Sequence, residues 1–153
     1  MRRCIWIMPW LTCLLFSSSI RAQYDLIIEP KPPQANSREE LDGYLNIIQV
    51  QDPAQLIAKS SEFSRLFPTS EFLGQVYRLE MRSYQALNDH QNTVAAGEKV
   101  LRVSPRDPEA LLTLAKVLPS LKDEKESNLN RAERYAQSAL EAIADLNDKK
   151  SKK

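Results

Sequence analysis

The sequence predicts an all-α protein whose short antiparallel helices stack in pairs. Apolar residues recur at three- and four-residue spacing from Ser37 nearly to the end of the chain, which is the period of amphipathic helices. The 153 residues include only three glycines, so the tight turns of a β-rich fold have few candidates. Prolines and N-capping residues mark the helix boundaries instead, and the short connections between helices make neighbours antiparallel.

The first 22 residues have the composition of a secretory signal peptide. Arg2 and Arg3 precede an apolar run over residues 4–16, and the segment ends in the small residue Ala22. We expect cleavage between Ala22 and Gln23, because the apolar run is shorter than the about 20 residues that a membrane span needs. The predicted location is therefore periplasmic or extracellular, with no membrane span in the mature form. An uncleaved N-terminal anchor is the alternative.

Cleavage leaves a mature chain with no cysteine and a small negative charge. Cys4 and Cys13 both lie in the predicted signal peptide, so we expect neither a disulfide nor thiol chemistry. Three arginines are also lost, which lowers Lys+Arg from 21 to 18 against 20 Asp+Glu and moves the net charge from +1 to −2. A surface this close to neutral argues against nonspecific binding of nucleic acid.

Residues 23–36 read as a linker rich in proline, because Pro30, Pro32 and Pro33 favour an extended backbone. The helical domain then spans residues 37–147. Its first helix follows a capping box formed by Ser37 and Glu40.

The later helices have equally clear start and stop signals. Asp-Pro dipeptides at residues 52–53 and 107–108 place an N-cap before a proline at the first helical position. Pro68, Pro105 and Pro119 act as stops. Residues 148–153 are expected to form a disordered basic tail. The predicted helices span residues 38–50, 53–67, 70–87, 90–103, 108–118 and 129–146.

Pro68 and Pro105 each close a helix pair, and they are 37 residues apart. The segment between them has a turn at Asn88 and small residues inside its second helix. This pattern resembles the tetratricopeptide repeat, a unit of about 34 residues and two helices, over residues 37–146. It looks most like the bacterial envelope members of that family, in which a Pro-x-Ser junction with a few extra residues separates the repeats. Met81 and Gly97 depart from the family pattern, which has glycine and an aromatic residue there.

The resemblance implies a right-handed α-solenoid of about three antiparallel helix pairs, with the first helix of each pair lining a concave groove. An unrelated six-helix bundle is the alternative fold. Family members commonly bind an extended peptide or a partner helix in this groove. By the family register, Leu41, Leu45 and Ile48 also stand on the groove side, but we expect them to pack inside or against the linker. The candidate partner-binding residues are Gln75, Arg78, Arg82, Gln85 and Lys116.

The basic members of that set, Arg78, Arg82 and Lys116, suggest that the groove holds carboxylates of a partner. Ordinary solvated charges on helix faces are the alternative interpretation.

The sequence has none of the common catalytic or phosphate-binding motifs. His90 is the only histidine, so a metal site is not expected, and neither is a cofactor. We therefore expect a non-enzymatic scaffold or adaptor that binds another protein, with homo-oligomerisation possible. A membrane-tethered repeat protein and a small-ligand carrier are the alternatives.

Overall fold

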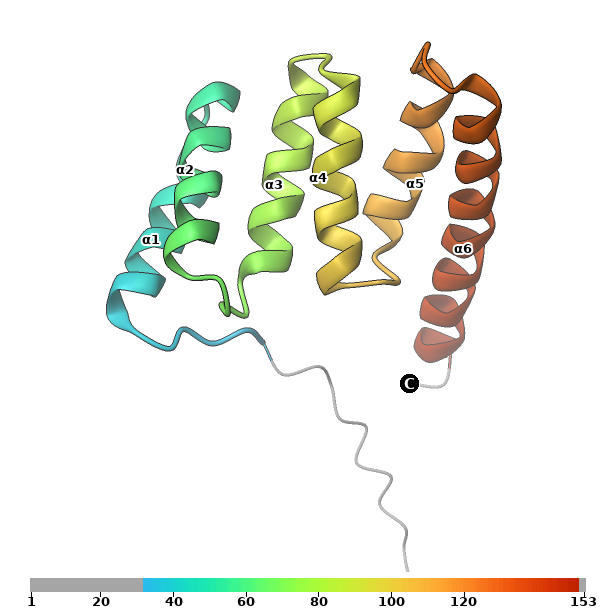
Figure 1. Ribbon diagram of the computed structural model, residues 1–153. Coiled ribbons are helices and arrows are strands. Elements are labelled where there is room, and N and C mark those ends of the chain that lie inside the picture. Colours follow the sequence, from blue (N-terminus) through green and yellow to red (C-terminus); the bar gives the residue numbers. More distant parts are fainter. Residues whose placement is uncertain (1–31, 152–153) are drawn as a thin grey trace, which may run out of the picture. The chain divides into compact units, whose positions relative to one another are not determined.

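The computed structural model describes residues 32–151, which belong to one compact unit. The predicted signal peptide, its cleavage site at Ala22 and Gln23, and residues 23–31 of the linker lie outside the described residues. Within residues 32–151 all regular secondary structure is helical, so the prediction of an all-α protein is confirmed (Figure 1). The elements are α1 (Arg38–Ile48), α2 (Pro53–Leu66), α3 (Leu73–Ala86), α4 (His90–Val103), α5 (Pro108–Val117), the 3₁₀ turn η1 (Leu118–Ser120) and α6 (Lys125–Ser151).

Consecutive helices of this unit run antiparallel, because each connection joins two helices at the same end (Figure 1). The main contacts follow the order of the chain: α1 packs on α2, α2 on α3, α3 on α4, α4 on α5, and α5 on α6. Most contacts are therefore between elements that are adjacent in sequence.

Side chains also link helices that lie two apart in the sequence. The ring of Tyr44 in α1 stacks on Phe72 at the start of α3, with the ring centroids 4.3 Å apart. Arg78 of α3 donates to Asp107, the N-cap of α5, at 2.7 Å. An ion pair between Glu98 and Arg131 joins α4 to α6, which are also two helices apart. Helices α1, α3 and α5 are therefore neighbours in one row, and this row contains the predicted site residues.

The predicted N-caps are present. The side chain of Asp52 accepts from the amide of Gln55 at 2.8 Å, and that of Asp107 accepts from Ala110 at 2.9 Å. Ser37 caps α1 by accepting from the amide of Glu40 at 3.1 Å. The Glu40 carboxylate in turn accepts from Asn36 at 2.6 Å, one residue before the amide that a capping box predicts.

Helices α3 and α6 differ most from their predicted limits. Helix α3 begins at Leu73 rather than residue 70, because the side chain of Ser70 accepts from the amide of Phe72 and holds a turn there. Helix α6 begins at Lys125 rather than residue 129, and it continues to Ser151. Residues 148–151 are thus helical, whereas a disordered tail was predicted. The stretch from Lys125 to Ser151 contains neither glycine nor proline to end the helix.

The core is a series of buried clusters, each shared by neighbouring helices. Small buried residues, such as Ala132 and Ala139 of α6, allow the close helix packing that the sequence predicted. Among the described helices, none combines the length and the apolar character that a membrane crossing requires. The largest members of the clusters are Ile47, Phe63, Phe72, Val76, Met81, Val100, Leu111, Leu114 and Leu118.

Candidate interaction surfaces

The row formed by α1, α3 and α5 carries all the candidate partner-binding residues. Arg82 and Lys116 are exposed, whereas Gln75, Arg78 and Gln85 are half-buried. Two of the three basic residues are engaged within the chain, so the row differs in charge from the predicted groove.

Arg78 and Arg82 bind carboxylates at the start of α5. Besides the bond from Arg78 to Asp107, Arg82 makes a forked contact with Glu109, in which Nε lies 2.5 Å from Oε1 and Nη2 lies 2.6 Å from Oε2. This hydrogen bonding raises the pKa of the Arg82 guanidinium further above its ordinary value. The carboxylates that the sequence predicted for a partner are thus supplied, at these two arginines, by the chain itself. Lys116 lies two turns farther along α5.

The apolar strip of α1, defined as Leu41, Leu45 and Ile48, is the main apolar feature of this row. These side chains are 40 %, 39 % and 45 % exposed. The alternative prediction, contact with the linker, involves residues 23–31, which lie outside the described residues. The prediction that they pack inside was wrong. The reason is that Glu40 and Ile47 take the inward positions of α1 and Tyr44 is half-buried, which turns the strip outward beside α3.

Glu40 is only 2 % exposed, and one of its carboxylate oxygens accepts from the amide of Asn36 at 2.6 Å. Hydrogen bonding from the Ser70 side chain lowers the pKa of Glu40; burial opposes this shift, and the amide of Asn36 adds to it. The apolar pattern of the sequence alone does not predict an acidic residue on the inner side of α1.

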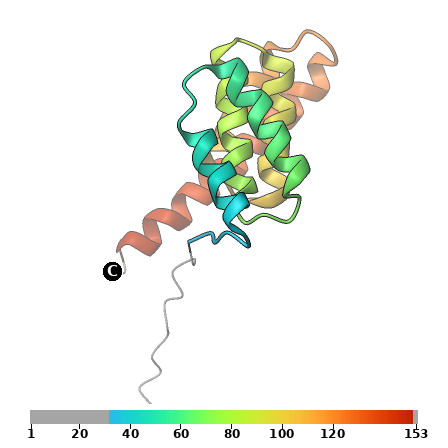
Figure 2. The same cartoon turned by 90° about the vertical axis from the view of Figure 1, so that its left-hand side faces the viewer.

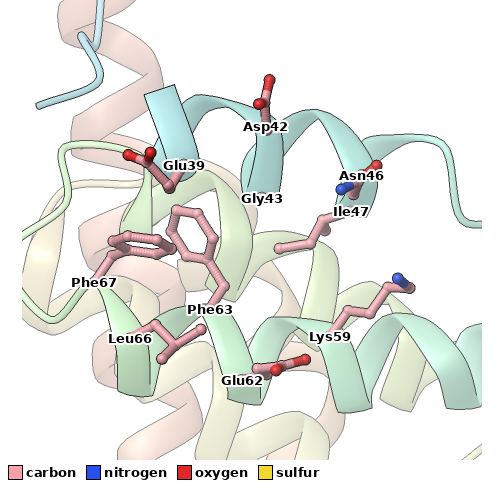
Figure 3. A pocket seen from close by; sticks show the side chains of 10 residues that line it. All are labelled: Glu39, Asp42, Gly43, Asn46, Ile47, Lys59, Glu62, Phe63, Leu66 and Phe67. Carbon is pink, nitrogen blue, oxygen red and sulfur yellow. The ribbon is translucent and has the colours of Figure 1, made fainter. Parts of the chain in front are cut away.

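A second surface, the α1–α2 groove, was not predicted from the sequence. It has a volume of about 410 Å³ and lies between one side of α1 and one side of α2 (Figure 3). Figure 3 shows the rings of Phe63 and Phe67 and the side chain of Ile47 in the space between the two helices. The Cβ of a larger residue at Gly43 would lie 3.3 Å from the Phe63 ring, so glycine permits this close approach.

The α1–α2 groove is acidic at its edges. Three carboxylates and one ammonium group surround its apolar floor, and they belong to Glu39, Asp42, Glu62 and Lys59. One feature of the sequence could have indicated this groove. Its lining residues recur at three- and four-residue spacing on both helices, so they lie on one side of each helix.

Within residues 32–151, no three His, Cys, Asp or Glu side chains are placed to hold a metal ion. His90 is exposed at the first position of α4.

The sequence matches no family model and no curated protein, and the structure matches no solved structure. A function for this protein is therefore inferred from its own residues and surfaces.

Proposed function

We propose that residues 37–147 form a right-handed solenoid of about three tetratricopeptide-like helix pairs, and that this scaffold binds a segment of another protein on the row formed by α1, α3 and α5. The antiparallel order of the helices and the links between α1, α3 and α5 support this proposal. One helix pair buries its apolar face only when neighbouring pairs stack on it.

The two departures from the family pattern also support the proposal, because they compensate for each other. A Cβ at Gly97 would lie 3.4 Å from the sulfur of Met81 and 3.0 Å from the side chain of Leu114. A large residue thus stands where the family has a small one, and a small residue stands opposite it. The small residue leaves room for the large one, as close packing of the interior requires.

The turn between α3 and α4 is consistent with the same resemblance. Asn88 has a φ of 57°, which lies in the left-handed region where glycine and asparagine are favoured. The family commonly has glycine at this turn.

The exposed apolar strip of α1 is the observation that carries the binding proposal. Single exposed apolar residues are common, but three at i, i+4 and i+7 form a continuous stripe on one side of a helix. An amphipathic helix or an extended apolar segment of a partner would bury this stripe. Since Arg78 and Arg82 are paired internally, apolar contact rather than charge dominates recognition, and Lys116 contributes the accessible positive charge.

The proposed scaffold is non-enzymatic, needs no cofactor and acts after export to the periplasm or the exterior. The basic start and short apolar run of residues 1–22 support export. Mass spectrometry of the mature N-terminus separates this from a tethered protein: a chain that begins at Gln23 supports cleavage, whereas a retained Met1 or Arg2 contradicts it.

The test of partner binding is crosslinking and co-purification from the envelope fraction of the native host. The tagged protein is compared with a Leu41→Lys/Leu45→Lys/Ile48→Lys variant. The matched control is Val103→Lys/Leu129→Lys, which changes exposed apolar residues of α4 and α6.

We expect a partner that co-purifies with the wild type and the control and is lost with the strip variant, while far-UV circular dichroism stays helical. A partner retained by all three proteins contradicts binding at α1. Metabolite-induced thermal stabilisation in the absence of any partner supports a small-ligand carrier instead.

A further inference from the structure

We propose that the α1–α2 groove binds a basic amphipathic helix of another protein, with the apolar side of that helix on the groove floor and its lysine or arginine side chains at the acidic rim. This surface is separate from the apolar strip of α1. Glu39, Asp42 and Asn46 line the groove, whereas Leu41 and Leu45 of the strip do not and lie on another side of the helix. The two surfaces therefore bind independently.

The floor of the groove offers apolar and aromatic contact. The ring centroids of Phe63 and Phe67 are 5.0 Å apart, with their planes tilted by 50°. Gly43 has no side chain to cover these rings from the side of α1. Leu66, which is 52 % exposed, extends the floor towards the solvent. An occupant that covers Leu66 and the half-buried Phe67 removes apolar surface from water, which drives the binding of a helix in a groove.

The rim of the groove is negative. Three exposed carboxylates, those of Glu39, Asp42 and Glu62, stand against the exposed ammonium group of Lys59, which gives a formal charge of −2. Asp42 also lies 3.7 Å from Arg38, and counting Arg38 leaves the rim at −1. These two side chains are 59 % and 89 % exposed, so their ion pair is weak and the carboxylate stays accessible. Charge complementarity therefore favours a cationic occupant.

Acidic and aromatic groups meet at one end of the groove. Because α1 and α2 are antiparallel, the first turn of α1 lies beside the end of α2, and Figure 3 shows Glu39 at the same end as the Phe67 ring. Lys59 lies at the other end, with Ile47. A lysine or arginine side chain has an apolar stem and a cationic head, so it can lay its stem on the ring and place its charge at Glu39. The basic residues of the partner helix are therefore expected at this end.

The groove is open to a helix from outside the described unit. Figure 2 looks onto the first hairpin, and the other helices of the unit lie behind α1 and α2. The pair α3 and α4 packs between α2 and α5, whereas α1 is the first helix of the described residues and has no such neighbour before it. The lining residues of α1 run from Glu39 to Ile47, about 12 Å at 1.5 Å per residue, so about two turns of a partner helix fill the groove.

The probe for this site is a stapled helical peptide of about four turns, with leucine on one side and lysine at its flanks. A matched peptide carries glutamate in place of each lysine. Fluorescence anisotropy measures the binding of each labelled peptide to the purified protein. We expect the lysine peptide to bind at least about tenfold more tightly than the glutamate peptide at low salt, and the difference to shrink at high salt because exposed charges are screened. Equal binding of the two peptides, or no binding of the lysine peptide up to about 1 mM, would overturn the proposal.

Reversal of the rim charge gives the decisive comparison. The variant Asp42→Lys/Glu62→Lys changes the formal charge of the four rim residues from −2 to +2. It should lose the lysine peptide and bind the glutamate peptide instead. The matched control, Glu133→Lys/Glu141→Lys, makes the same change in net charge at exposed positions of α6 and should bind the lysine peptide as the wild type does. An equal loss in the control would show nonspecific attraction and contradict the site.

The apolar floor has its own test. Leu66→Gln removes the exposed leucine of the groove, and Leu140→Gln changes a leucine of α6 that is 68 % exposed. We expect the first variant to weaken binding of the lysine peptide about fivefold and the second to leave it unchanged. Equal affinities of both variants and the wild type would contradict contact with the floor.

Two further measurements identify the occupant and the surface. A variant with a neutral strip, Leu41→Gln/Leu45→Gln/Ile48→Gln, should bind the lysine peptide normally, and its loss of binding would place the peptide on the strip and overturn the proposal. Sedimentation of the protein alone tests a second copy as the occupant: association that rises with concentration and disappears in Asp42→Lys/Glu62→Lys would also overturn it. Circular dichroism checks that every variant is folded. Failure to capture a partner at the strip leaves these outcomes unaffected, so the two proposals are tested separately.

Discussion

At the scale of single residues, Gly97 of α4 packs closely against Leu114 of α5 and Met81 of α3. Leu114 and Met81 are both fully buried, so neither has room to move away from a new methyl group at Gly97. Residue 97 must therefore be small because a large side chain, Met81, fills the neighbouring space.

This contact predicts opposite outcomes for two glycines. Gly97→Ala should lower the free energy of unfolding by about 1 kcal/mol through overpacking. Gly74→Ala should raise it by about 0.5 kcal/mol, because the new Cβ makes only ordinary contacts at 3.7 Å and alanine is the better helix former. Urea unfolding measures both changes. In a Leu114→Ala background the cost of Gly97→Ala should disappear, because the Leu114 side chain is the nearest neighbour of the new Cβ, and an unchanged cost would show that the two residues are not coupled.

Glu40 makes stability depend on pH. Hydrogen bonding, mainly from Ser70, lowers its folded-state pKa below the ordinary value of 4.5. A lowered pKa stabilises the folded state at pH values above the unfolded pKa, and this stabilisation is lost as the pH falls through the folded pKa. Glu40→Gln should therefore cost about 1 kcal/mol at neutral pH.

The difference between wild type and Glu40→Gln should shrink as the pH falls from 4.5 through the lower folded-state pKa, because the wild-type carboxylate then becomes protonated and uncharged. Denaturant unfolding at several pH values measures this difference. Ser70→Ala, which removes the hydroxyl that lowers this pKa most, should reproduce part of the effect. A difference that is the same at pH 7 and at pH 3 would contradict this role for Glu40.

At the scale of helices, one side chain at the start of α5, that of Asp107, both caps its own helix and binds a neighbouring helix. One oxygen of Asp107 caps α5 through Ala110, and the other accepts from Arg78. Asp52 caps α2 in the same way, but it is exposed. The two N-caps therefore form a natural pair for measuring what the link to α3 contributes.

We expect Asp52→Ala to cost about 1 kcal/mol, the usual value of an N-cap. Asp107→Ala should cost about 2–3 kcal/mol, because it also removes the carboxylate to which the half-buried Arg78 donates, leaving only Glu109, 3.9 Å from Nε. In an Arg78→Met background the cost of Asp107→Ala should fall to that of Asp52→Ala. Thermal or urea unfolding of the four proteins measures this, and equal costs in the wild-type background would show that the ion pair contributes nothing.

The sequence predicts helices well where local signals mark their ends. Helix α4 has the predicted bounds, and α2 and α5 begin at the predicted prolines, because an N-cap and a proline act within one turn. The start of α3 and the limits of α6 depend on the Ser70 turn and on a run without helix breakers. Both were therefore predicted less accurately.

The candidate surfaces were harder to predict because they depend on contacts between distant residues. The carboxylates that bind Arg78 and Arg82 are 29 and 27 residues away in the sequence. The exposure of the α1 strip follows from the inward position of Glu40, which no apolar pattern indicates. The α1–α2 groove exists only when the facing sides of two helices are placed side by side.

At the scale of the whole described unit, contacts between successive helices predict that stability varies along the chain. Helix α3 has six buried residues and α1 has two. In a stacked repeat each pair interacts only with its neighbours, so one end can open while the other stays folded. In a six-helix bundle around one core, a defect anywhere lowers the protection of every helix.

Hydrogen exchange therefore distinguishes the proposed solenoid from a single bundle. Ile47→Ala removes a buried side chain of α1 and should cost about 2–4 kcal/mol in local stability. We expect faster exchange of the slow amides in α1 and α2 and no change in α5 and α6. The reciprocal control, Leu111→Ala in α5, should accelerate α5 and α6 and leave α1 unchanged. Equal acceleration of all six helices by either variant would favour the bundle, because the chain would then unfold as one cooperative unit.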